Sequence, residues 1–289
     1  MMKVWMLPLC LWALSVLSTA GSVYAGDETR VISIDGSITE IVYALGAADH
    51  LVGVDTTSRY PAAAQALPNV GYMRQLTAEG ILSLQPSLVI TTAEAGPVAV
   101  LEQLDQAGLR VETITTDSSI AGVYAKIRRV AQLLVVQERG EELIGRLQSN
   151  IQTLQAQLHD RRGQAPPKVM FLLAAGNHGV MLAGKNTHAD AMIQVMGGVN
   201  VVSDFNSYKP LTPEGGLQTL PDIIVVADTG SGGQAPASER VLEQFQLLQH
   251  TPAARQKRVI TADSMLLLGF GPRIDQAIEA MAPAFYVSR

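Results

Sequence analysis

Residues 31–54 read VISIDGSITEIVYALGAADHLVGV, and this stretch decides the fold. Two short runs rich in β-branched residues, at 31–34 and 51–54, flank a segment with helical periodicity. A third apolar run follows at 87–90. Strands that alternate with helical segments are typical of parallel sheets covered by helices, so the sequence predicts an α/β fold.

The first helix has recognisable ends. Ser37 and Glu40 have the spacing of a capping box, in which the hydroxyl and the carboxylate each accept a hydrogen bond from a backbone amide. Gly46 can adopt the left-handed backbone conformation that commonly ends a helix. The sequence therefore predicts a helix that begins at Ser37 and stops at Gly46.

A long helical segment divides the chain into two halves. Residues 119–162 contain no proline, and apolar residues recur there every three or four positions. This pattern predicts one helix, a turn near Gly140 and a second, longer helix. Pro166 and Pro167 follow, and a strand is expected at 168–173. A long helix between two α/β halves is a stiff connector and not a flexible linker.

The first 25 residues have the composition of a secretory signal peptide. Lys3 is their only charged residue, an apolar run at 4–17 follows, and Val23-Tyr24-Ala25 has the pattern of a cleavage site. Cys10 lies inside the run, but the bulky Leu9 before it makes a lipid anchor the lesser alternative. We expect a signal peptide at 1–25, which means that the mature chain is exported.

The remaining residues are expected to form two lobes. We assign residues 26–136 to an N-terminal α/β lobe, residues 137–165 to the connector helix and residues 166–289 to a C-terminal α/β lobe. Without the signal peptide the chain keeps 20 of its 21 Lys and Arg residues and all 26 Asp and Glu residues, so the formal net charge changes from -5 to -6. The mature chain lacks the basic excess typical of proteins that bind nucleic acid.

The residue types also restrict the chemistry. Cys10 is the only cysteine, so a metal site in the mature chain would have to use oxygen or nitrogen ligands. The sequence contains neither a Gly-x-Ser-x-Gly elbow nor a His-Glu-x-x-His motif, and its five histidines are scattered. These absences argue against an exported hydrolase and favour a protein that is not an enzyme.

Two segments of the chain resemble each other. Residues 76–86, LTAEGILSLQP, match residues 211–221, LTPEGGLQTLP, at six of eleven positions without a gap. In both segments a threonine is placed to cap a short helix, and a proline ends that helix before a strand. Two related lobes would place Glu79 and Glu214 at equivalent points, although two short capped helices of similar composition are the alternative explanation.

The segment 69–84, NVGYMRQLTAEGILSL, gives the chain a specific resemblance. It is similar to the haem-binding branch of the periplasmic binding proteins that serve ABC importers of iron complexes and vitamin B12. Residues 37–46 and the turn 269–273, GFGPR, resemble the same branch. The resemblance implies the class III periplasmic binding protein fold, with two Rossmann-like lobes joined by a long rigid helix. It also implies that Glu79 and Glu214 dock on arginines of the two permease subunits.

The resemblance implies that Tyr72 is the axial ligand of ferric haem iron. A phenolate oxygen is a suitable hard base for ferric iron, and this ligation occurs among haem proteins. A free tyrosine has a pKa of about 10, so the iron has to favour the anion. Arg74 could add a positive charge and a hydrogen bond to the phenolate oxygen, although a solvated charge or a loop ion pair is the alternative. Gly71 permits a tight turn before the ligand.

The contribution of the C-terminal lobe is less well defined. Relatives often supply a sixth iron ligand or a contact to a haem propionate from that side, and the candidates here are His178, His188, Lys209 and Arg273. His178 lies in a glycine-flanked loop after a strand, where open α/β sheets place their ligands. Arg273 begins the last helix, so a purely structural role is its alternative. The loop 228–233 lacks the arginine that some haem binders carry there.

The resemblance therefore implies a carrier for ferric haem (hemin) in iron uptake. It would be a periplasmic monomer that delivers haem to an inner-membrane ABC permease with its ATPase subunits, without inserting into the membrane. A ferric siderophore or cobalamin is the alternative cargo, and the absence of tryptophan from the mature chain weakens the siderophore alternative. A zinc or manganese carrier would need His50, His178 and His188 to converge.

Overall fold

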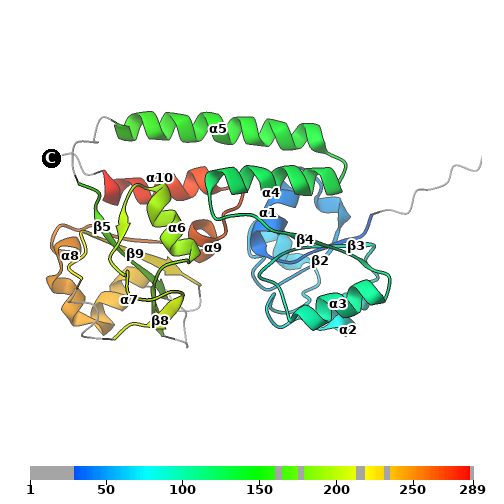
Figure 1. Cartoon of the computed structure of the whole chain (residues 1–289), viewed down its shortest axis with the longest axis horizontal. Helices are drawn as coiled ribbons and strands as arrows, with labels where there is room; N and C mark the ends of the chain where they lie inside the picture. The colour runs from blue at the N-terminus through cyan, green and yellow to red at the C-terminus, as the bar shows by residue number, and fades with distance from the viewer. Residues whose placement is uncertain (1–28, 160–164, 175–178, 213–218, 231–234, 287–289) are drawn as a thin grey trace, which may run out of the picture.

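The computed structural model describes residues 29–159, 165–174, 179–212, 219–230 and 235–286. The predicted signal peptide, His178 and Glu214 lie outside these residues. Figure 1 shows two groups of strands and helices side by side, with one long helix lying across both. In the described part of the chain, no helix is both long enough and apolar enough to cross a membrane.

The N-terminal lobe contains a parallel sheet of four strands in the order β2-β1-β3-β4. Its strands are β1 (Val31–Ser33), β2 (Leu51–Val54), β3 (Leu88–Thr92) and β4 (Arg110–Ile114). Its helices are α1 (Gly36–Ala44), α2 (Ala78–Leu82), α3 (Val98–Gln106) and α4 (Ile120–Leu133), with short 3-10 turns η1 (Ala48–His50) and η2 (Ala62–Ala66).

Both faces of this sheet are buried. Val31 and Ile90 belong to the core that includes residues of α1 and α4, whereas Ile32 and Val89 belong to the core that includes residues of α2 and α3. Successive strand residues point to opposite faces, so a strand covered on both sides has to be apolar throughout. This requirement explains the continuous β-branched runs in the sequence.

The C-terminal lobe contains a mixed sheet in the order β10-β9-β5-β6-β8, with β7 paired to β5. Strands β5, β9 and β10 are parallel, whereas β6 and β8 form antiparallel pairs. The strands are β5 (Lys168–Ala174), β6 (Val180–Ala183), β7 (Val199–Asn200), β8 (Tyr208–Pro210), β9 (Ile223–Asp228) and β10 (Val259–Asp263). The helices are α6 (His188–Val195), α7 (Ala237–Gln244), α8 (Pro252–Arg255), α9 (Ser264–Leu268) and α10 (Ile274–Phe285), with a 3-10 turn η4 (Gln246–His250).

Helix α5 (Gln137–His159) connects the two lobes. It packs on α4 from the first lobe and on α10 from the second, as the top of Figure 1 shows. Its buried residues Leu143, Leu147 and Ile151 belong to one core cluster that contains residues of both lobes. The predicted α/β architecture with a long connecting helix is therefore confirmed, while the residue boundaries assigned to the lobes stay a prediction.

The turn before α5 lies earlier than the sequence predicted. Helix α4 ends at Leu133, and Val135 has the positive φ of 58° that reverses the chain. Gly140, which we expected to form the turn, lies buried within α5. A β-carbon there would come within 2.7 Å of the Ala131 β-carbon in α4. The predicted turn near Gly140 is therefore wrong, because this glycine permits close helix packing.

The start of α1 also differs from the prediction. Asp35 is the residue that caps α1, and its carboxylate accepts a hydrogen bond of 2.7 Å from the Ser37 amide. The Ser37 hydroxyl instead accepts a hydrogen bond from Lys126, and Glu40 pairs with Arg273. The predicted capping box is wrong because tertiary partners take both of its side chains.

Candidate ligand-binding site between the lobes

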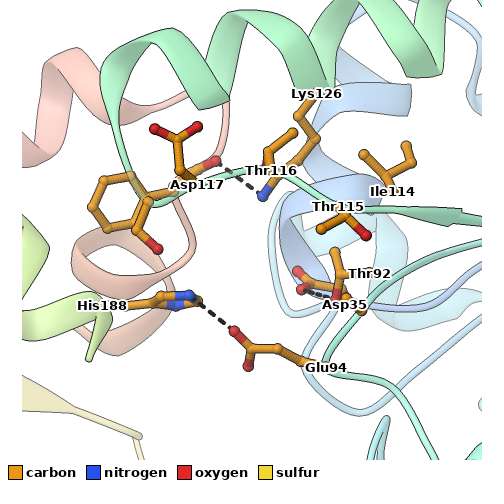
Figure 2. Close-up of a pocket in the computed structure, with 12 residues that line it drawn as sticks. Asp35, Thr92, Glu94, Ile114, Thr115, Thr116, Asp117, Lys126 and His188 are labelled. Carbon is orange, nitrogen blue, oxygen red and sulfur yellow. Dashed lines mark hydrogen bonds and ion pairs between the residues drawn. The ribbon is translucent and has the colours of Figure 1, made fainter. Parts of the chain in front are cut away.

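The candidate site lies at the carboxyl ends of strands of the N-terminal lobe, where they face α6 and the turn before α10 of the C-terminal lobe. Asp35 follows β1, Glu94 follows β3, and both line a cavity of about 60 Å³ that is also lined by His188 from α6 (Figure 2). Open α/β sheets bind their ligands at the carboxyl ends of their strands. The other residues that line the cavity are Thr92, Ala93, Ile114, Thr115, Thr116, Asp117, Ser118, Lys126 and Phe270.

Tyr72 lies in the loop between β2 and α2. Gly71 before it has a φ of 99°, a left-handed conformation that favours glycine. The Tyr72 side chain is 38% exposed, and Arg74 Nη1 donates a hydrogen bond of 3.2 Å to its hydroxyl oxygen. The structure thus places the phenol in contact with both solvent and a fixed cation.

Glu94 extends this contact to the opposite lobe. One carboxylate oxygen accepts a short hydrogen bond from Arg74 Nη2, and the other lies 2.9 Å from His188 Nε2. Figure 2 shows the Glu94 and His188 side chains pointing toward each other from different elements. The hydrogen bond to His188 and the charges of His188 and Arg74 lower the pKa of Glu94 to about 2. Tyr72, Arg74, Glu94 and His188 therefore form one chain of polar contacts between the lobes.

Glu94 was not predicted from the sequence. It lies two residues after the end of β3, and this position could have indicated a site residue, because side chains there face the ligand edge of the sheet. His188 was predicted, and its ring packs edge-to-face against Phe270 at 5.7 Å between centroids. This contact orients the imidazole toward Glu94.

Tyr208 in β8 is a second tyrosine near these charges. It is half-buried, and burial raises the pKa of its phenol. A phenol of raised pKa holds its proton more firmly, so burial disfavours a phenolate at Tyr208.

Lys126 is a buried charge beside the site. Its Nζ atom donates hydrogen bonds to the Ser37 hydroxyl at 2.9 Å and to the carbonyl oxygens of Phe270 at 3.2 Å and Gly269 at 3.3 Å. Burial lowers the pKa of Lys126, and nearby carboxylates oppose this effect. These bonds tie the N-terminal lobe to the turn before α10. The sequence carried no signal for this residue.

Arg273 lies in a second contact between the lobes. Its Nε donates a hydrogen bond of 2.9 Å to one oxygen of the Glu40 carboxylate, and Nη2 donates one to the other oxygen. The guanidinium also lies 3.9 Å from the centre of the Tyr60 ring. The side chains of Arg273 and Glu40 are only 13% and 5% exposed. Burial raises the pKa of Glu40, and the Arg273 hydrogen bonds and charge oppose the rise.

A third contact involves Arg59 of the N-terminal lobe. It donates hydrogen bonds to Asp263 at 2.9 Å and to the Thr229 carbonyl oxygen. Thr229 belongs to the loop in which the sequence analysis noted a missing arginine. An arginine from the other lobe therefore lies against this loop.

The remaining predicted residues are dispersed. Glu79 is exposed in the first turn of α2, where Thr77 accepts a hydrogen bond from the Gly80 amide as predicted. Lys209 lies over the Phe205 ring at 4.4 Å. Among the residues that the structure describes, no three His, Cys, Asp or Glu side chains are placed to hold a metal ion.

Comparison with known proteins connects this geometry to a family. The sequence profile of the family described as periplasmic binding protein matches residues 31–266. The periplasmic heme-binding protein RhuT from Roseiflexus sp. RS-1, in its apo form, shares 39% sequence identity at a TM-score of 0.80 and covers 90% of this chain and 98% of its own. A periplasmic heme-binding protein from Pseudomonas aeruginosa shares 35% identity at a TM-score of 0.79, over 89% of this chain and 92% of its own.

A third relative binds another cargo. The vitamin B12-binding protein of Yersinia pseudotuberculosis is 28% identical over 80% of this chain and 81% of its own length. All these relatives are binding proteins, which confirms the prediction that the chain is not an enzyme. The fold of the similar structures is the class III fold that the sequence resemblance implied.

Proposed function

The chain belongs to the periplasmic binding protein family, and from that premise we propose that it carries ferric haem, bound through the Tyr72 phenolate. The family works with ABC permeases and their ATPase subunits, and this chain is a solute-binding protein of such a transporter. Its proposed role is to receive haem in the periplasm and to deliver it for iron uptake.

The exposed Tyr72 hydroxyl in contact with Arg74 carries the proposal. Ferric iron prefers hard anionic oxygen, and a guanidinium 3.2 Å away lowers the electrostatic cost of a phenolate. The heme-binding proteins from Roseiflexus and Pseudomonas aeruginosa, at 39% and 35% identity, support haem as the cargo. Haem supplies the iron, while the chain supplies the anion and the neighbouring cation.

Cobalamin is the second candidate cargo. The 28% identity to a vitamin B12-binding protein favours it, although the Yersinia relative is less similar than the heme-binding structures. A ferric siderophore remains the alternative from the sequence analysis. We propose that Arg273 and His178 contribute contacts from the C-terminal lobe, and the Glu40 pair of Arg273 gives that residue a structural role as well.

An absorption titration tests the proposed cargo. The chain from residue 26 onward is titrated with ferric haem and, separately, with cobalamin, beside Tyr72→Phe and Tyr72→Ala. Tyr60→Phe is a matched control, because Tyr60 is also exposed and lies under Arg273. We expect a stoichiometric high-spin tyrosinate spectrum in the wild type and in Tyr60→Phe, and its loss in both Tyr72 variants.

Each other outcome has a definite meaning. Haem binding no stronger than that of an unrelated protein overturns the proposal, and tight cobalamin binding then supports the second candidate. Haem binding that survives Tyr72→Phe unchanged keeps the cargo but refutes the ligand.

We propose that Glu79 and Glu214 dock on the permease. Glu79 is exposed on a short helix, where it can meet a partner charge, and the sequence similarity of residues 76–86 and 211–221 supports an equivalent role for Glu214. Glu79→Arg should abolish stimulation of the transporter's ATPase by the loaded protein while leaving haem binding intact. Full stimulation by Glu79→Arg would refute this docking role.

A further inference from the structure

Glu94 and Arg74 belong to two loops that are fastened to each other. The Gly96 amide donates a hydrogen bond of 2.9 Å to the Met73 carbonyl oxygen, and the Leu76 amide donates one of 3.0 Å to the Gly96 carbonyl oxygen. The Glu94 loop therefore has a fixed position beside the loop that carries Tyr72. Backbone hydrogen bonds of this kind make the distance between the two side chains reproducible.

The Arg74 side chain divides its two terminal nitrogens between these loops. Nη1 contacts the Tyr72 hydroxyl, and Nη2 contacts Glu94. The guanidinium is planar and rigid, so fixing one nitrogen also fixes the direction of the other. Without Glu94, the exposed Arg74 side chain would populate many rotamers and would no longer keep this orientation. The contact to Tyr72 thus depends on the contact to Glu94.

His188 holds the second oxygen of Glu94 from the opposite lobe. It begins α6, whose first turn is capped by Thr187, and its ring is packed on Phe270. The 2.9 Å contact therefore starts from a fixed imidazole. Both carboxylate oxygens of Glu94 are engaged, one by Arg74 within its own lobe and one by His188 of the other lobe. Figure 2 shows the contact with His188.

We propose that Glu94 is a positioning residue of the haem site, which holds Arg74 against Tyr72 and is itself anchored by His188 of the other lobe. This inference rests on the proposed function. It means that the strength of the iron–phenolate bond depends on a contact outside the iron's own ligands. Such outer contacts orient metal ligands and tune their properties in many proteins. The lowered pKa of Glu94 keeps the carboxylate ionised under the conditions of the test.

A double-mutant cycle tests this role. Haem dissociation into an excess of apomyoglobin is measured for Glu94→Ala, Arg74→Ala and the double variant. We expect each single substitution to speed dissociation about fivefold, which corresponds to the loss of one hydrogen bond of about 1 kcal/mol at an exposed site. The double variant should be no faster than Arg74→Ala alone, because Glu94 acts through Arg74.

Spectra separate positioning from a general structural role. The tyrosinate-to-iron absorption band should shift equally in Glu94→Ala and Arg74→Ala, since both free the phenolate oxygen from its donor. Glu94→Gln keeps an oxygen acceptor for Arg74 and should restore most of the loss. His188→Ala should have a smaller effect of about twofold, because Arg74 retains its partner. Glu102→Gln, an exposed acidic residue in α3, is the matched control.

Several results would overturn the inference alone. The inference is overturned if Glu94→Ala releases haem at the wild-type rate and its absorption band does not shift. It is also overturned if the effects of Glu94→Ala and Arg74→Ala on the dissociation rate multiply in the double variant. Arg74→Lys gives an independent check that leaves Glu94 intact, because a lysine lacks the fork and should behave as Arg74→Ala does. A wild-type protein that fails to bind haem would instead overturn the proposed function.

Discussion

The buried pair of Glu40 and Arg273 allows a quantitative prediction about the contact between the lobes. Arg273→Met keeps the length of the apolar stem but leaves the Glu40 carboxylate, 5% exposed, without its cation. A carboxylate left without its partner can avoid the cost of a buried charge by taking up a proton. At pH 7 this protonation costs about 3.7 kcal/mol for an ordinary glutamate pKa of about 4.3. This cost is the upper limit of the electrostatic penalty, and it agrees with the range of about 3–5 kcal/mol for broken buried pairs.

The expected result depends on pH in a defined direction. At pH 7 we expect Arg273→Met to lower the free energy of unfolding by about 3 kcal/mol, which corresponds to a fall in Tm of about 6 °C for a chain of this size. At pH 5 protonation of the orphan costs only about 1 kcal/mol, so the defect should shrink. Urea and thermal unfolding, followed by circular dichroism at both pH values, measure these changes.

Two further variants make the test specific. Glu40→Met combined with Arg273→Met removes the orphan charge, so the double variant should be more stable than Arg273→Met alone. Arg146→Met on the exposed side of α5 is the control and should change stability by less than about 0.5 kcal/mol. A loss below about 1 kcal/mol at pH 7, or a double variant that loses the sum of both single effects, would refute the reasoning.

Three other predictions follow from the described contacts. Gly140→Ala should lose about 1–3 kcal/mol in urea unfolding, because its β-carbon would lie 2.7 Å from that of Ala131, whereas Gly145→Ala, whose β-carbon would have no atom beyond its own stretch of helix within 4 Å, should gain about 0.5 kcal/mol. Changes of the same sign would contradict this. The ionised form of Glu94 stabilises the fold above the ordinary carboxyl pKa of about 4.3, and that contribution is lost as the pH falls to about 2. Glu94→Gln should therefore lower Tm at pH 7 but not at about pH 2. The fall at pH 7 should be slight, because the Glu94 side chain is 40% exposed. An equal fall in Tm at both pH values would contradict this prediction. Small-angle scattering curves of the empty and haem-loaded protein should match, because a rigid helix and buried polar contacts join the lobes. A clear decrease in the radius of gyration on loading would contradict this prediction.

Patterns of neighbouring residues predicted the parts of the fold that depend on local chemistry. Strands buried on both faces need continuous apolar runs, and these runs are visible at 31–34 and 87–90. Thr77 caps α2 as its position indicated. Gly140 was misjudged because glycine serves both turns and close helix packing, and only the neighbouring Ala131 distinguishes the two uses. The antiparallel strands β6 and β8 also depend on pairing that the sequence pattern does not specify.

In the candidate site, too, contacts between neighbouring residues could be predicted and contacts between distant residues could not. Tyr72 and Arg74 are two residues apart, so their contact could be anticipated from one segment of sequence. Glu94 meets His188 across 94 positions of the chain, and no local pattern connects them. Glu40 resembled a helix cap because its spacing from Ser37 fits one, but its partner lies 233 residues away. Charges buried by tertiary contacts are therefore the residues that local reasoning misassigns.

The polar contacts between the lobes differ in strength, and that difference bears on how a ligand enters. The Glu40–Arg273 pair is buried, and breaking such a pair costs about 3–5 kcal/mol. The Glu94–His188 contact is formed by side chains that are 40% and 37% exposed, and contacts of this kind are worth about 1 kcal/mol or less. We therefore expect a ligand that enters beside Tyr72 to open the weaker contact while the buried pair holds the lobes together. The Glu94–His188 contact then re-forms beside the bound ligand, so access to the site requires only a rearrangement of side chains and no change in the arrangement of the lobes.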